Sequence, residues 1–199
     1  EYIQLSLKGE STKDERWNIL LDTKSQIEQK MNDLQETLDV INYNLKYNDD
    51  FNFGFDVVDE YARICPEKQA LVWCDDEGRE RKFNYGELSK YTNKTANYFK
   101  SLGIKKGDMV MLILKRHYEC WFSIIALHKL GAVTIPATHL LTKKDVVYRC
   151  NSAKIKMIVC ADDDVVTKHI EDSLSESPTV KAIVVDRGEK EGWHSFEKG

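Results

Sequence analysis

The chain has 199 residues, of which 42% are hydrophobic and 31% charged, and its formal net charge is −4. This balance is typical of a folded globular protein, and the modest negative charge does not favour nucleic acid or an anionic membrane as a partner. No apolar stretch is long enough to span a bilayer, and the first residues lack the basic start and apolar core of a secretory signal. We therefore expect a cytoplasmic location.

The cysteines and histidines are scattered and form no ligand pattern. None of the five cysteines belongs to a Cys-x-x-Cys pair, which argues against a disulfide framework and against a zinc site. His117 and His128 could share a helix face, but no acidic or thiol partner stands at ligand spacing from them. We expect reduced cysteines and no metal ion. The cysteines are Cys65, Cys74, Cys120, Cys150 and Cys160.

A long helix is predicted from about Trp17 to Tyr47, with a start near Ser11 and carboxylates in its first turn. Its apolar residues alternate in steps of four and three, which is the heptad seam of a coiled coil. Lys24 interrupts this seam. The seam predicts a homodimer, although a helical hairpin or linker within one chain remains the alternative. The seam residues are Leu20, Ile27, Met31, Leu34, Leu38, Ile41 and Leu45.

The segments IQLSLKGEST and IEQKMNDLQETLDVINYNLKY resemble the C-terminal end of a MerR-family transcriptional regulator. In that family a long helix pairs antiparallel with its twin, so the resemblance implies dimerisation. The family's winged helix-turn-helix would lie before Glu1, so the resemblance does not extend to DNA binding. Residues 1–48 are therefore expected to form a coiled-coil dimerisation segment.

Residues 49–199 read as a separate α/β domain. Four short apolar runs, each too short for a helix, are typical of buried strands, and helical segments separate them. Such a pattern predicts a parallel sheet that is covered on both faces and joined by right-handed βαβ crossovers. The runs are Gly107–Leu114, Ala132–Thr138, Ile155–Ala161 and Val180–Asp186.

Other local signals place a hairpin and the helices. A turn at residues 76–78 separates Ala70–Asp75 from Arg81–Glu87 and predicts a β-hairpin. A helix beginning near Val57 ends before Pro66, and Gly103 closes an amphipathic helix that begins near Leu88. Further helices are expected over 116–131, from a capped start at Thr142, and over 162–174.

Two stretches resemble the beginning of AMP-forming acyl-CoA synthetases, closest to the medium-chain type. These are DVVDEYARICPEKQALVW and GIKKGDMVMLILKRHYECWFSIIALHKLGAVTIPATHLLTKKDVVYR, and the resemblance covers about residues 50–199. Such enzymes activate a carboxylic acid with ATP to an acyl-adenylate and then transfer the acyl group to coenzyme A. The resemblance implies ATP, Mg²⁺ and coenzyme A for the full-length enzyme.

The 199 residues do not contain the family's phosphate loop, which is rich in Thr, Ser and Gly and ends in Pro-Lys. They also lack its later nucleotide-binding motifs and the small C-terminal domain with the adenylation lysine. The positioning and charge stabilisation that speed nucleotidyl transfer are then missing. We expect no catalytic residue, no bound cofactor and no adenylation by this polypeptide alone.

The resemblance also implies a rim of coenzyme A contacts. In family members the turn after the strand equivalent to residues 132–138 lies near the coenzyme A nucleotide, which places Thr138, His139 and Arg149 there. The alternative is that all three are ordinary exposed polar residues. Arg116 and His117, at the mouth of a core strand, stand where α/β proteins place binding groups, although they could equally serve to order the loop.

Two functions follow from these patterns. The first is an N-terminal fragment of an acyl-CoA synthetase that is folded but catalytically incomplete. The second is an interaction or regulatory module that dimerises through its helix and does not bind DNA. The junction near Asn48 to Phe53 indicates a fusion, an engineered chimera or a gene remnant.

Overall fold

The chain folds into two units, Glu1–Phe51 and Asn52–Gly199. The structure is a computed structural model that describes residues 12–47 and 51–199, with side chains described at 12–42 and 51–199. Within the described residues, no helix combines the length and apolar character that a membrane span requires.

The first unit contains one helix, α2 (Lys13–Tyr47), with Asp14 and Glu15 in its first turn. The prediction of a long helix is thereby confirmed. Six predicted seam side chains are between 37% and 64% exposed in this unit, and the side chain of Leu45 lies outside the described residues. The predicted cap at Ser11 also lies outside them. Pairing of this helix with a second copy stays a prediction.

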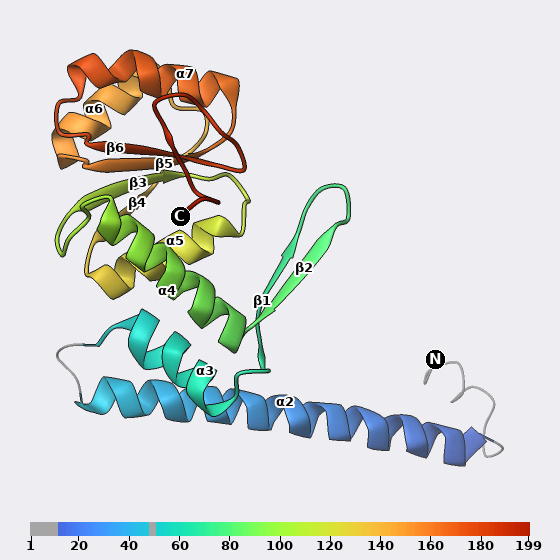
Figure 1. The fold of residues 1–199 in the computed structure, drawn as a ribbon. Helices are drawn as coiled ribbons and strands as arrows, with labels where there is room; N and C mark the ends of the chain where they lie inside the picture. The colour runs from blue at the N-terminus through green and yellow to red at the C-terminus, as the bar shows by residue number, and fades with distance from the viewer. Residues whose placement is uncertain (1–11, 48–50) are drawn as a thin grey trace. The chain divides into compact units, whose positions relative to one another are not determined.

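The second unit is built on a five-stranded parallel sheet in the order β4-β3-β5-β6-β7, which confirms the predicted fold class (Figure 1). In register, Val110 of β3 lies opposite both Thr134 of β4 and Met157 of β5. The strands are β3 (Met109–Ile113), β4 (Val133–Pro136), β5 (Met157–Ala161), β6 (Ala182–Asp186) and β7 (His194–Ser195).

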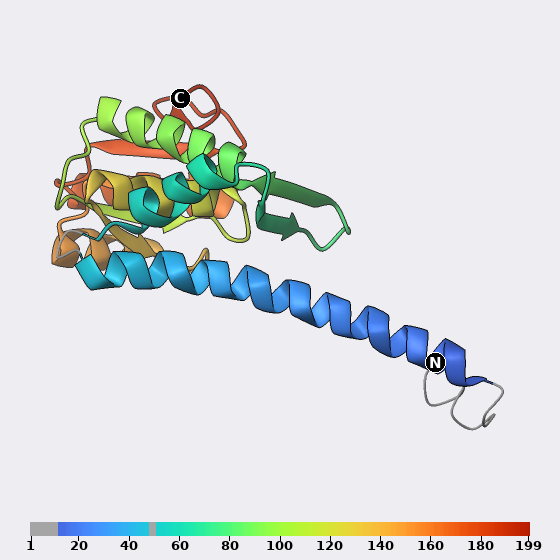
Figure 2. The same ribbon diagram turned by 90° about the horizontal axis from the view of Figure 1, so that it is seen from below.

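Helices cover both faces of this sheet (Figures 1 and 2). Helices α4 (Tyr85–Ser101) and α5 (Glu119–Leu130) pack on one face, and α6 (Lys143–Ala153) and α7 (Asp164–Ser173) on the other. Successive strand residues alternate between the two cores: Leu112 packs with the α4 and α5 side, and Ile113 with the other. Because both faces are buried, the strands need no polar positions, which explains their continuous apolar sequence.

Residues that favour helix ends stand where the helices begin and end. Thr142 and Asp145 form a reciprocal capping box at the start of α6. Gly131 ends α5 with φ at 66°, in the left-handed region that glycine adopts without a Cβ penalty. Asp163 caps the start of helix α7, because its carboxylate accepts the N–H groups of Val165 and Val166, and the helix is followed by a short 3₁₀ turn, η3 (Leu174–Glu176).

The hairpin pairs β1 (Gln69–Cys74) with β2 (Glu80–Asn84) and extends away from the parallel sheet (Figure 1). The prediction that its second strand continues to Glu87 is wrong, because Asn84 caps α4 and exchanges hydrogen bonds with Glu87. The helix predicted from about Val57 begins earlier, as a π-helix, η2 (Phe53–Asp59), which continues into α3 (Glu60–Ile64).

Strand β7 was not predicted. It has only two residues, and both are polar. Neither alternation nor an apolar run can be detected over such a length. Phe196, directly after it, donates its N–H to the carbonyl of Val185 at 2.9 Å, so backbone bonding to β6 holds this strand.

Candidate functional site

The loops that follow the parallel strands converge at the carboxyl edge of the sheet. β3 lies between β4 and β5, so the chain order reverses at β3. In open α/β sheets a ligand crevice forms at such a reversal, outside the carboxyl ends of the strands. A functional site is therefore expected at this edge.

A cavity of about 500 Å³ opens there. The hairpin forms one wall, and the loops after β3, β4 and β6 form the rest. Its size suits a small-molecule ligand, and its basic groups outnumber its carboxylates. The lining residues are Trp73, Asp75, Asp76, Arg79, Lys115, Arg116, His117, His139 and Arg187.

The structure separates the three residues that were expected to contact coenzyme A. His139 lines the cavity, whereas Thr138 and Arg149 are not among its lining residues. The Thr138 hydroxyl accepts the N–H of Leu140 at 3.2 Å, and Arg149 is exposed on α6. Arg116 and His117, which were expected at the mouth of a strand, both line the cavity.

The basic side chains of the cavity already have carboxylate partners. Lys115 Nζ lies 2.6 Å from Asp163, which binds it from the start of α7. Arg116 lies 3.0 Å from Asp76, although both side chains are highly exposed. Exposed ion pairs of this kind contribute little to stability. An anionic ligand could therefore displace the Arg116 pair more readily than the Lys115 pair.

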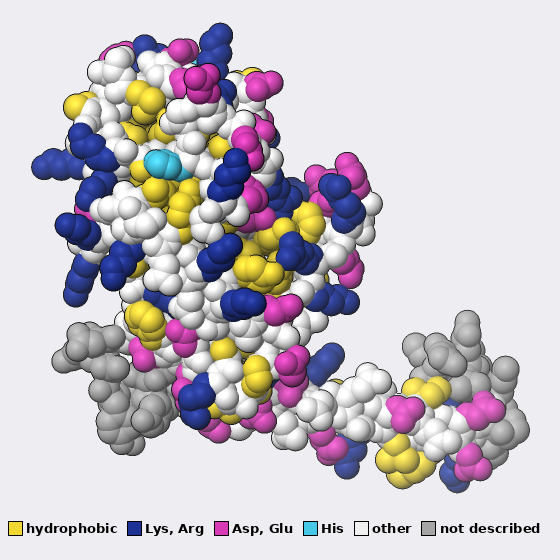
Figure 3. Space-filling model, viewed as in Figure 1, with side chains coloured by type: hydrophobic (Ala, Val, Ile, Leu, Met, Phe, Trp, Pro, Cys, Tyr) yellow, Lys and Arg dark blue, Asp and Glu magenta, His cyan; other side chains and the backbone are white. Residues whose placement is uncertain are grey.

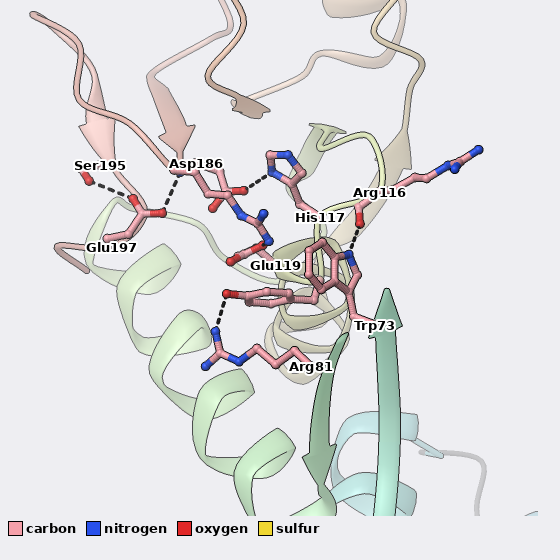
Figure 4. A network of polar contacts seen from close by, with 10 residues as sticks. Trp73, Arg81, Arg116, His117, Glu119, Asp186, Ser195 and Glu197 are labelled. Carbon is pink, nitrogen blue, oxygen red and sulfur yellow. Dashed lines mark hydrogen bonds and ion pairs between the residues drawn. The ribbon is translucent and has the colours of Figure 1, made fainter. Parts of the chain in front are cut away.

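A polar network begins at His117 and Arg187 of the cavity lining and extends to the buried Glu119 and Asp186 (Figure 4). His117 Nδ1 is 2.7 Å from Asp186 Oδ2, and Glu119 Oε2 accepts a hydrogen bond from Arg187 at 2.9 Å. Asp186 is fully buried, and burial raises the pKa of this carboxyl to about 6; the hydrogen bond from His117 opposes the rise and the charge of Glu119 adds to it. Its second oxygen, Oδ1, is buried without a hydrogen-bond partner.

Arg187 connects this network to the hairpin. It has φ at 59°, a strained backbone conformation for a residue with a Cβ. Its guanidinium lies 5.2 Å from the ring centre of Trp73 and 4.6 Å from that of Tyr118, within the range of cation–π attraction. Trp73 in turn donates its indole N–H to the carbonyl of Arg116 at 2.5 Å. These contacts hold the hairpin wall of the cavity against the sheet.

Sequence reasoning missed the group of three side chains at the centre of this network. His117, Glu119 and Asp186 each place one possible ligand atom within 4.8 Å of the others. Spacing in the sequence could not reveal the group, because Asp186 follows His117 by 69 positions. The available signal was the aspartate at the end of the strand VKAIVVD, since the carboxyl ends of parallel strands meet at one edge.

The opposite edge of the sheet also carries basic side chains and a cavity. Figure 3 shows Lys and Arg side chains gathered on the side where the strands begin. A second cavity there is lined by Lys154, Lys156 and Lys181 among others, and Lys156 pairs with Asp108 at 2.8 Å. No aromatic side chain lines this cavity. The carboxyl edge is therefore the stronger candidate site.

Comparison with known protein families identifies a match over most of the second unit. Residues 58–198 match the family described as AMP-binding enzyme. The chain belongs to this family. The match covers the hairpin, every strand of the parallel sheet and the whole of the carboxyl-edge network.

Relatives in the AMP-binding family are acyl-coenzyme A synthetases. The mitochondrial acyl-coenzyme A synthetase ACSM5 of Rattus norvegicus is 32% identical over 155 residues, and ACSM4 of the same organism is 34% identical over 155. ACSM4 of Homo sapiens is 33% identical over the same length. Each comparison covers 74% of this chain and 26% of the relative, so the chain spans about a quarter of the length of these relatives.

These comparisons correct one expectation and leave another open. The expected cytoplasmic location is wrong in the light of the relatives, which are named as mitochondrial enzymes. Amino-acid composition could not predict the organelle, because delivery to an organelle depends on a targeting signal that a receptor recognises and not on composition. The family match begins at residue 58, so the resemblance of the first segment to MerR regulators stays a prediction.

Proposed function

We propose that residues 52–199 serve as the first part of an AMP-forming acyl-CoA synthetase that activates a medium-chain carboxylic acid. The reaction joins the acid to AMP with release of pyrophosphate and then transfers the acyl group to coenzyme A. The family match over residues 58–198 carries this proposal. The doubly covered parallel sheet with a cavity at its carboxyl edge supports it.

The 199-residue polypeptide by itself does not catalyse adenylation under this proposal. Its ten glycines never cluster into a phosphate-binding loop, and backbone amides in such a loop are what hold a triphosphate. ATP and Mg²⁺ would therefore require residues beyond those of this chain. The test is pyrophosphate exchange with medium-chain acids: a rate at background is expected, and a rate well above background contradicts the proposal.

Coenzyme A is proposed to contact the rim of the carboxyl-edge cavity through His139, with Thr138 and Arg149 further out. The lining fits an anionic nucleotide because its lysine and arginines can bind phosphate. A thermal-shift titration with coenzyme A should raise the melting temperature of the wild type. His139→Ala should reduce that shift, and no shift at saturating coenzyme A would count against the contact.

A mitochondrial location is also proposed, because the relatives named above are mitochondrial. The full-length protein should fractionate with mitochondria in cells that express it. Recovery of the protein in the cytosolic fraction alone would contradict this proposal.

A second proposed function is dimerisation through α2. The specific observation is its stripe of exposed apolar side chains, of which Met31 is 63% and Leu34 is 64% exposed. Heptad stripes of this kind are buried when two helices pair. We propose a homodimer that binds neither nucleic acid nor membrane. Light scattering should give a dimer for the whole chain and a monomer after removal of residues 1–47; an unchanged mass would contradict the proposal.

A further inference from the structure

The group formed by His117, Glu119 and Asp186 brings two buried carboxylates together beside one imidazole ring. Glu119 is 7% exposed and Asp186 is fully buried. Arg187 donates a hydrogen bond to Glu119 at 2.9 Å, and His117 Nδ1 lies 2.7 Å from Asp186 Oδ2. Buried carboxylates are normally paired or bound to a metal.

A second and independent observation concerns a single atom. Asp186 Oδ1 is buried and has no hydrogen-bond partner. Leaving a buried polar atom unpaired destabilises the folded state, so such an atom needs an explanation. It belongs to the same carboxylate that His117 contacts at 2.7 Å.

We propose that His117, Glu119 and Asp186 bind one divalent transition-metal ion. Each side chain offers one ligand atom, and these atoms lie within 4.8 Å of one another. Zinc bonds of about 2.1 Å place tetrahedral ligand atoms about 3.4 Å apart. Metal binding would therefore break the 2.7 Å hydrogen bond between His117 and Asp186 and would move the more distant ligand atoms together by roughly 1 Å. His117 and Glu119 come from the start of α5 and Asp186 from the end of β6, so the ion would join these two elements.

The chemical types of the three ligands indicate which class of metal ion they would bind. One imidazole nitrogen with two carboxylate oxygens suits Zn²⁺ and its first-row neighbours, whereas Mg²⁺ and Ca²⁺ prefer oxygen ligands alone. Arg187 bonds only Oε2 of Glu119, so its other oxygen can face the ion. This arrangement resembles the supporting hydrogen bonds that orient metal ligands in other proteins.

The proposed ion would keep an open position toward the carboxyl-edge cavity. His117 and Arg187 both line that cavity. Three protein ligands leave a fourth tetrahedral position for water or another small ligand, as in zinc sites that are not purely structural. This inference does not depend on the proposed synthetase activity.

Isothermal titration of the whole chain with Zn²⁺ tests the proposal. One saturable site is expected, and His117→Ala should weaken it by at least about tenfold, because loss of even a residue that only orients a metal ligand commonly costs that much. His139→Ala is the matched control, because His139 lines the same cavity outside the group, and it should leave the affinity unchanged. Circular dichroism checks that each variant is folded.

Cobalt substitution separates this site from the five free cysteines. The Co²⁺ complex should show ligand-field absorption without cobalt–thiolate charge-transfer bands, and His117→Ala should lose that absorption. Three results would overturn the proposal: no saturable Zn²⁺ binding, thiolate bands in the cobalt spectrum, or equal weakening by His117→Ala and His139→Ala.

Discussion

Lys129 Nζ lies 2.6 Å from Asp59 Oδ1, although the Lys129 side chain is only 2% exposed. The same ammonium group also donates to Asn93 Oδ1 at 2.8 Å. The interaction ties the end of α5 to the π-helix η2 and to α4.

Lys129→Ala should destabilise the protein by about 3 kcal/mol, because removal of one partner leaves a partly buried carboxylate without its counter-charge. Urea unfolding followed by circular dichroism measures the change. Lys198→Ala is the matched control, since Lys198 pairs with Glu189 where both side chains are about two-thirds exposed. It should change stability by less than about 0.5 kcal/mol. Equal effects of the two variants would show that burial does not govern the Lys129 pair.

A mutation that creates a cavity in the core beside β3 should lower the free energy of unfolding. Leu112 is 2% exposed and packs against the α4 and α5 side of the sheet. Leu112→Ala should cost about 2–5 kcal/mol in free energy of unfolding, from lost burial and from the void. Val133→Ala, at a site that is 42% exposed on the edge strand β4, should cost less than about 1 kcal/mol. A loss under that limit for Leu112→Ala would contradict the proposed packing.

The charge of Asp163 should stabilise the protein in a pH-dependent manner. A hydrogen bond from Lys115 lowers the pKa of this carboxyl, and the N–H groups at the start of α7 lower it further. A folded-state pKa below the unfolded value gives stability that is present above about pH 4 and lost as the pH falls through the folded value. Asp163→Asn keeps a capping side chain and removes the charge. The difference in melting temperature between wild type and variant should therefore be largest near neutral pH and shrink below about pH 4.

Pairing through the seam of α2 can be tested by substituting single residues with aspartate. Leu34→Asp places a carboxylate in the middle of the exposed stripe and should convert a dimer to a monomer in light scattering, because a buried charge without a partner is costly. Gln35→Asp places the same group beside the seam and should leave the mass unchanged. A dimer that persists in Leu34→Asp would mean that another surface mediates association.

Local sequence patterns predicted four of the five strands of the parallel sheet, but they did not predict the site. Strands such as β5 are apolar at every position, and caps such as Thr142 with Asp145 act over three residues, so short-range patterns predicted them. The pairing of His117 with Asp186 depends on strand order, which no local pattern encodes. The left-handed backbone conformation of Arg187 could not be predicted from the sequence either, because tertiary contacts with Glu119 and two aromatic rings maintain it.

The strand order also dictates when the sheet can form during synthesis. β3 is made before both of its neighbours, β4 and β5, and one of its edges stays unpaired until residue 161 has left the ribosome. All five of its residues are apolar, and an unpaired apolar strand is a site of aggregation. The nascent chain should therefore engage chaperones while residues 109–161 emerge, and release should coincide with the pairing of β5.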